Sequence, residues 1–186
     1  MVTCVASTLF MFSIGHSTRT FDELVSLLRE NGVERLADIR RYPGSRRHPH
    51  FSSEALQREL PKQGIAYEHW VELGGRRKPS PDSRNVALRN EQFRAYADYM
   101  ATPEFRTAVD RLLTSDLITC VMCAEAVPWR CHRNLLSDDL VRRGVEVLHI
   151  LGPRKTGKHA LSKIARIEGD HVVYRDVQET LDFDAL

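Results

Sequence analysis

Residues 119–133 read TCVMCAEAVPWRCHR, a pattern typical of the strand-to-helix connection in an α/β fold. The apolar run over residues 117–122 predicts a buried strand that ends at Cys123. A loop with an acid and a Pro-Trp pair follows, and the next helix is expected over residues 131–143, ended by Gly144. Open α/β sheets build their ligand sites from such loops. The stretch therefore predicts a core strand and, directly after it, a functional edge.

Strand and helix patterns alternate on both sides of this stretch. A capping box of Thr20 and Glu23 starts the first helix, and its short links to the flanking strands imply a parallel pair. Further strands are expected over residues 9–14, 33–39, 65–70 and 145–151, and further helices over residues 52–63, 91–100 and 103–114. We therefore predict a mostly parallel, helix-flanked open sheet. Its strand order stays open, because two successive helices separate the third strand from the fourth.

The pattern changes after Gly152. Residues 153–159 are expected to form a basic loop, and the short apolar runs on either side of residues 168–170 predict a β-hairpin. The sequence thus divides into an α/β domain over residues 1–152 and a small C-terminal β appendage over residues 153–186.

Arginine dominates the basic residues and is clustered, although the net charge is only +2. One cluster surrounds Tyr42 and contains Arg40, Arg41, Arg46 and Arg47, and a second follows a Gly-Gly pair at residues 76–78. Such clusters recognise phosphate, carboxylate or nucleic acid, and the alternative is that they are solvated loop charges. We expect the partner to be an anionic small molecule or a nucleic acid.

Cysteine usage and hydropathy predict the compartment. Three of the four cysteines fall in one short segment, so the chain lacks a secreted disulfide framework, and a reduced, cytoplasmic setting is expected. The opening MVTCVASTLFMFSIG has no basic segment and predicts a short leader plus the first core strand rather than a signal peptide. No run approaches the roughly 18 apolar residues of a membrane helix, so no membrane association is expected. The oligomeric state stays open.

Four motifs in order resemble the family known as domain of unknown function 488. They are IGHSTRTFDELVSLL, ADIRRYPGSRRHPHF, the Tyr-x-His-x-x-x-Leu-Gly-Gly run over residues 67–75, and CAEAVPWRCHRNLL. The resemblance covers residues 12–152 and implies a small, cytoplasmic, bacterial or archaeal α/β protein. It implies no activity, and the residues after Gly152 match none of the motifs.

The candidate site consists of polar residues that follow the predicted strands. Because the carboxyl ends of parallel strands meet at one edge of a sheet, they are expected to converge. These residues are His16, Ser17, Asp38, Arg40, His69, Cys123, Glu125 and His149. We predict that Asp38, Arg40, Cys123, Glu125, His132 and Arg133 surround one cleft.

Catalytic roles are expected for Cys123, Glu125, Asp38 and His132. Cys123 is the candidate nucleophile, since a thiol near arginines, an imidazole and a helix start can react as a thiolate. Glu125 is a candidate general base or hydrogen-bond acceptor. The alternatives are a buried apolar cysteine and a solvated acid paired with a neighbouring arginine.

An anion is expected at the helix start near Cys131, with Arg133 as its bidentate anchor. The alternative is that these groups cap the helix and form surface pairs. The other residues predicted to bind substrate or anion are His16, Ser17, Arg40, Tyr42, Arg46, His69 and Arg130.

No metal or cofactor is predicted. The spacing C-x7-C-H at Cys123, Cys131 and His132 lacks the usual C-x2–4-C pair of a zinc site. Two adjacent ligands on the expected helix would also point to different faces. Cys120 forms a C-x-x-C pair with Cys123, but it is expected to lie buried within the strand.

Three functions fit these residues. The first is an enzyme that acts on a nucleotide, nucleoside or nucleic-acid base, either at a glycosidic bond through a carboxylate or by a thiol-dependent transfer. The second is a non-catalytic nucleic-acid or nucleotide-binding module, and the third is a thiol-based redox or metal-binding protein. The sequence contains no P-loop, GxGxxG or HExxH motif that would choose between them.

Overall fold

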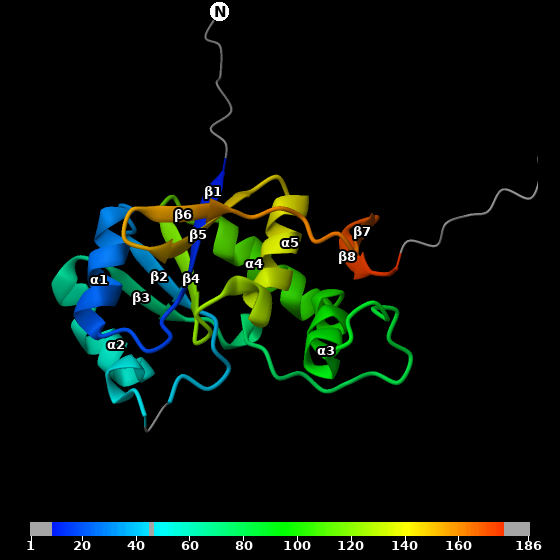
Figure 1. Cartoon of the computed structure of the whole chain (residues 1–186), viewed down its shortest axis with the longest axis horizontal. Coiled ribbons are helices and arrows are strands. Elements are labelled where there is room, and N and C mark those ends of the chain that lie inside the picture. The colour runs from blue at the N-terminus through cyan, green and yellow to red at the C-terminus, as the bar shows by residue number, and fades with distance from the viewer. Residues whose placement is uncertain (1–8, 45–46, 177–186) are drawn as a thin grey trace, which may run out of the picture.

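A six-stranded sheet forms the centre of the computed structural model, which describes residues 9–44 and 47–176 (Figure 1). Five strands run parallel, and the sixth is antiparallel to its neighbour. In spatial order they are β3 (Ala66–His69), β2 (Arg35–Asp38), β4 (Thr119–Cys123), β1 (Phe10–Gly15), β5 (Glu146–Gly152) and β6 (Lys155–Lys158). The predicted mostly parallel open sheet is therefore confirmed.

Helices cover both faces of this sheet (Figure 1). They are α1 (Phe21–Glu30), α2 (Ser53–Glu59), α3 (Glu91–Met100), α4 (Pro103–Leu113) and α5 (Arg133–Arg142). Side chains alternate along each strand, so Ile14 and Leu36 contribute to a core with α1 and α2, whereas Val121 contributes to a second core with α3, α4 and α5. In the part of the chain that the structure describes, no helix is both long and apolar enough to cross a membrane.

The predicted capping box begins α1. The backbone amide of Thr20 donates to Glu23 Oε2 at 2.7 Å, and the amide of Glu23 donates back to Thr20 Oγ1 at 3.2 Å. These bonds satisfy two amides that a helix start otherwise leaves without partners. The start of α1 therefore follows from local sequence.

Residues 155–158 form an edge strand, where the sequence analysis expected a basic loop. β6 pairs with β5 and exposes two lysines at the edge of the sheet. Charged residues are common on edge strands because they discourage pairing with another chain. A polar edge strand lacks the apolar alternation on which the prediction relied.

The last two strands, β7 (Ala165–Glu168) and β8 (His171–Tyr174), form the expected hairpin as a separate two-stranded sheet. Asp138 of α5 is fully buried and accepts hydrogen bonds from Tyr174 Oη and His159 Nε2, each at 2.9 Å. Ser162 adds bonds from its amide and its hydroxyl. This network joins the C-terminal segment to α5.

Candidate functional site

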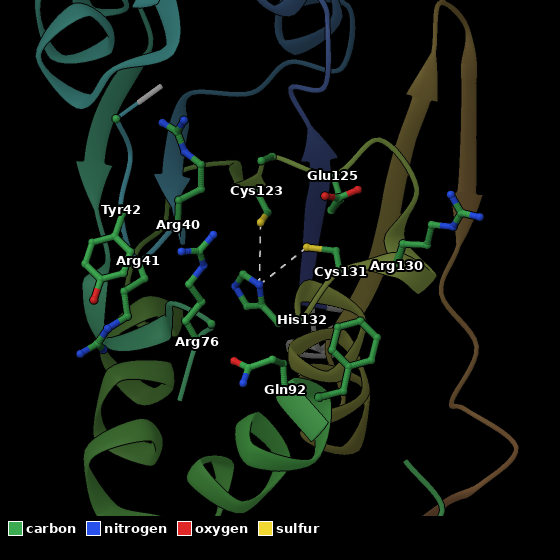
Figure 2. Close-up of a pocket in the computed structure, with 14 residues that line it drawn as sticks. Arg40, Arg41, Tyr42, Arg76, Gln92, Cys123, Glu125, Arg130, Cys131 and His132 are labelled. Atoms are coloured by element: carbon green, nitrogen blue, oxygen red, sulfur yellow. Dashed lines mark hydrogen bonds between the residues drawn. The ribbon is translucent and has the colours of Figure 1, made fainter. Parts of the chain in front are cut away.

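A cavity of about 510 Å³ opens at the carboxyl edge of the sheet (Figure 2). The last residues of the central strands lie level there, since Gly15 is paired with Cys123 and Asp38 with Met122. The cavity is lined by residues of the loops after β2 and β4, by Gly75 and Arg76, and by the first turn of α3. These residues are Arg40, Arg41, Tyr42, Gly44, Gly75, Arg76, Gln92, Phe93, Cys123, Ala124, Glu125, Arg130, Cys131 and His132.

Three side chains form a compact group at this cavity, which we call the Cys–His cluster: Cys123, Cys131 and His132. The Sγ atom of Cys123 lies 3.8 Å from His132 Nδ1, and that of Cys131 lies 3.7 Å from the same nitrogen (Figure 2). Cys123 is 7% exposed and Cys131 is 2% exposed, so both cysteines are almost completely buried. Two thiols thus share one imidazole nitrogen.

The start of α5 explains why these side chains converge. The helix begins at Arg133, not at Cys131 as expected, and Cys131 is extended (φ −132°, ψ 146°) at the end of a short 3-10 turn, Pro128–Arg130. Adjacent residues on a helix point about 100° apart, but this constraint does not apply across the turn. The sequence argument that Cys131 and His132 face different directions is therefore wrong.

The imidazole of His132 has a defined orientation. Its Nε2 lies 3.1 Å from the carbonyl oxygen of Ile39, which can only accept, so we assign the proton to Nε2 and a lone pair to Nδ1. Gly75 packs against the ring, where an added Cβ would lie 3.0 Å from Nδ1. The second glycine of the Leu-Gly-Gly motif is thus required for close approach to the cluster.

The two thiols have opposite pKa shifts. A hydrogen bond from Cys131, together with the neighbouring His132 and Arg133, lowers the pKa of Cys123 well below its usual value. Burial raises the pKa of Cys131 well above its usual value. Cys123 is therefore the sulfur that loses its proton first.

Asp38 does not open onto the cavity, contrary to the prediction. It is fully buried and accepts bonds from Arg40 Nε at 2.8 Å and from Tyr67 Oη at 2.9 Å. A second bond, from Arg40 Nη2 at 2.5 Å, makes the pair bidentate. Asp38 therefore neutralises and orients Arg40, which does line the cavity.

His16 lies behind Arg40 rather than in the cavity wall. Its Nε2 is 3.3 Å from Arg40 Nη1, and burial together with the Arg40 charge lowers the pKa of His16 to about 4. The neutral imidazole packs against Phe51, with ring centroids 4.4 Å apart. His16 thus supports the position of Arg40 and does not line the cavity.

Arg133 does not line the cavity either, and the predicted anion anchor is wrong in its geometry. Its side chain is 1% exposed and donates to the carbonyl oxygens of Glu125 and Ala126 at 2.5 Å and 2.9 Å. The first amides of α5 are also occupied, since those of Arg133 and Asn134 donate to the sulfur and the carbonyl oxygen of Cys131. The guanidinium holds the loop after β4 in place.

Three other arginines provide positive charge at the cavity. Arg41, Arg76 and Arg130 line it, and their side chains make no hydrogen bond or ion pair with any residue in the described ranges. Tyr42, at 68% exposure, lines the same space. Glu125 contributes the one carboxylate among the described lining residues. The cavity therefore has an excess of unpaired positive charge.

The remaining predicted residues lie outside the cavity wall. Ser17 adopts φ 50° and donates its amide to Ala124, and His69 binds the carbonyl oxygen of Arg40 through Nε2 at 2.8 Å. His149 was expected past a strand end but lies inside β5, where its ring contacts Ser13 and His159. Arg46 lies outside the described residues.

Gln92 and Phe93 of α3 were not predicted to line the site, and Arg41 and Arg76 were not assigned to it either. The Gly-Gly pair before Arg76 was the available signal, since it marks a close backbone approach. Nothing in the local sequence of α3 indicates that its first turn reaches the β4 loop.

Comparison with known proteins agrees with this arrangement of motifs. No curated protein and no solved structure gives a match. Residues 20–140, more than half of the chain, match the family model described as Domain of unknown function DUF488. The chain therefore belongs to the DUF488 family.

Proposed function

We propose that this protein is an enzyme that acts on an anionic substrate of nucleotide size, with the Cys–His cluster as its reacting centre. One observation carries the proposal: a single cavity combines the two buried thiols and the imidazole of that cluster with three arginines, Arg41, Arg76 and Arg130. Their side chains have no hydrogen-bond or ion-pair partner among the described residues. Its volume of about 510 Å³ falls in the range of small-molecule sites.

The residues around the cluster favour a nucleotide, nucleoside or nucleic-acid base. Guanidinium groups bind phosphate in a bidentate manner, and exposed aromatic rings such as Tyr42 can stack on a base. Phe93 adds a second aromatic side chain to the wall. Phosphate at the arginines and a base near the aromatic rings would place the reacting bond at the cluster.

The cluster activates the attacking group, and Glu125 moves the proton. A carboxylate that lines the cavity can accept a proton from the attacking group and return it to the leaving group. We also assign the activity to the cytoplasm, because Cys120, Cys123 and Cys131 are free thiols and thiols stay reduced there.

A panel of nucleotides, nucleosides and bases, followed by mass spectrometry of the products, tests this function. Arg76→Ala should lower kcat/KM for phosphorylated substrates by about tenfold, which corresponds to about 1.4 kcal/mol, and should affect uncharged nucleosides less. Arg58→Ala is the matched control, since Arg58 is an exposed arginine that does not line the cavity.

Binding without conversion would overturn the proposal. Nucleotides that bind with steep salt dependence and remain unchanged would instead support the non-catalytic binding module. Equal effects of Arg76→Ala and Arg58→Ala would refute the assignment of the substrate anion to this cavity.

A further inference from the structure

We propose that Cys123, Cys131 and His132 bind a divalent metal ion of the zinc class, with one coordination position open to the cavity. The two sulfurs and the nitrogen all lie within 4.8 Å of one another. The presence of the metal is independent of the proposed function, whereas its role in turnover rests on that function.

The distances within the cluster agree with tetrahedral zinc. Bond lengths of about 2.3 Å to sulfur and about 2.0 Å to nitrogen place a sulfur and a nitrogen about 3.5 Å apart around a tetrahedral ion. The two sulfur-to-nitrogen distances in the cluster are 3.8 Å and 3.7 Å. These two distances would need to shorten by only about 0.2–0.3 Å for an ion to enter.

The surroundings of the cluster orient its donor atoms toward a common point. His132 Nε2 faces the carbonyl oxygen of Ile39, which leaves the Nδ1 lone pair for a metal. Histidine ligands usually have such a partner on the second ring nitrogen. The amide of Arg133 lies 3.5 Å from the sulfur of Cys131 and donates to it, which favours the thiolate that a metal requires.

The number of ligands indicates a catalytic rather than a structural site. Structural zinc sites have four protein ligands, whereas catalytic sites have three and bind water at the fourth position. In the described residues, no fourth Cys, His, Asp or Glu joins the cluster. Cys123 and His132 both line the cavity, so water or substrate can reach the fourth position.

Glu125 lies where a zinc-dependent hydrolytic site has its general acid/base. It follows Cys123 by two residues and lines the same cavity. Zinc-dependent base deaminases likewise have a glutamate two residues after the first ligand, and this glutamate is not itself a ligand. The arrangement assigns hydrolysis to the proposed enzyme, with water as the second substrate.

The proposed hydrolysis consumes one water and changes no oxidation state. A bound ion would supply an activated water as the nucleophile. Glu125 would accept one proton from this water while the water oxygen bonds to the electrophilic carbon of the substrate. The bond from that carbon to the leaving group breaks, and Glu125 returns the proton to the leaving group.

Elemental analysis of the full chain purified under reducing conditions tests the site directly. We expect about one zinc per chain, removed by a chelator and restored by titration. Titration of the metal-free protein with Co²⁺ should produce sulfur-to-metal charge-transfer bands and the intense visible bands of a tetrahedral ion.

Variants identify the ligands. Cys131→Ser and His132→Asn should each weaken Co²⁺ binding at least about 100-fold. Cys120→Ala is the matched control, because Cys120 is the third described cysteine, lies in the same strand as Cys123 and is outside the cluster. It should bind Co²⁺ as the wild type does.

The outcomes separate the metal site from the proposed function. A wild-type chain that neither carries zinc nor binds Co²⁺ at micromolar concentrations overturns the site, as does unchanged affinity in folded Cys131→Ser. Metal binding without turnover of any nucleotide supports the site and removes the proposed function. Full turnover by the metal-free protein supports the proposed function and refutes a catalytic role of the ion.

Discussion

Replacement of Arg133 by methionine removes two hydrogen bonds that hold the loop after β4. Arg133 donates to the carbonyl oxygens of Glu125 and Ala126 at 2.5 Å and 2.9 Å. A hydrogen bond to a charged group contributes about 1.5–3 kcal/mol, so the two together contribute about 3–6 kcal/mol. Burial of the cation offsets part of this, and Arg133 Nε has no partner in the described residues. We expect a net loss of about 3 kcal/mol in the free energy of unfolding.

Urea and thermal unfolding followed by circular dichroism measure this loss. For a chain of this size, about 3 kcal/mol lowers Tm by about 6–12 °C. Arg133→Lys should give an intermediate value, because an ammonium cannot donate to both carbonyl groups in the fork geometry of a guanidinium. The matched control is Arg130→Met, which changes an exposed arginine without a described partner and should shift stability by less than about 0.5 kcal/mol.

The two substitutions should also differ in ligand binding. Arg130 lines the cavity and Arg133 does not, so only Arg130→Met should directly remove a contact to a bound anion. If Arg133→Met unfolds at the same urea concentration as the wild type yet loses anion affinity, the structural role of Arg133 is refuted. Arg133 would then be the anion anchor that the sequence analysis expected.

Three further substitutions or conditions test the surroundings of the cavity. Asp38→Asn leaves the buried guanidinium of Arg40 without its carboxylate, so the free energy of unfolding in urea should fall by about 3–5 kcal/mol. A loss below about 1 kcal/mol would show that the pair is dispensable. Gly75→Ala places a Cβ 3.0 Å from His132 Nδ1 and should lower the free energy of unfolding by about 1–3 kcal/mol. The control Gly44→Ala, whose Cβ meets nothing within 4 Å, should leave it almost unchanged. Equal Tm values for the two variants would contradict the close packing at Gly75. Burial and the neighbouring His159 lower the folded-state pKa of His149 from 6.5 to about 4, so its neutral form stabilises the fold above pH 6.5. This contribution should fall by up to about 1.4 kcal/mol per pH unit as the pH drops from 6.5 to 4, and an equally steep slope in His149→Gln would assign the acid sensitivity elsewhere.

Local interactions made much of the fold predictable. The start of α1 depends on a capping box within four residues, and the buried strands β1, β2 and β4 are short apolar runs with turn signals at their ends. Because parallel strands end at one edge, the order of elements along the chain also predicted that Cys123 and Arg40 would meet at one cavity. They do line the same space.

The remaining features depend on contacts between distant segments. The position of β4 between β2 and β1 was not predictable, since a connection that contains two helices allows several neighbours. β6 forms because β5 offers an open edge, and its polar residues carry no signal of their own. Gln92 and Arg76 join the cavity from elements that the sequence places far from Cys123.

The sequence by itself determined the chemistry available at the site, namely two thiols, an imidazole, a carboxylate and several guanidinium groups beside the end of a core strand. Only the tertiary structure decided which of them face one another. A 3-10 turn delays the start of α5 to Arg133 and thereby brings Cys131 and His132 to one point. Gly15 lets the loop after β4 pack so closely that its carbonyl groups capture Arg133. A long side chain such as that of Arg133 can reach either a ligand or the backbone of a neighbouring loop. Tertiary packing determines which of the two it contacts, and no local sequence pattern contains this information.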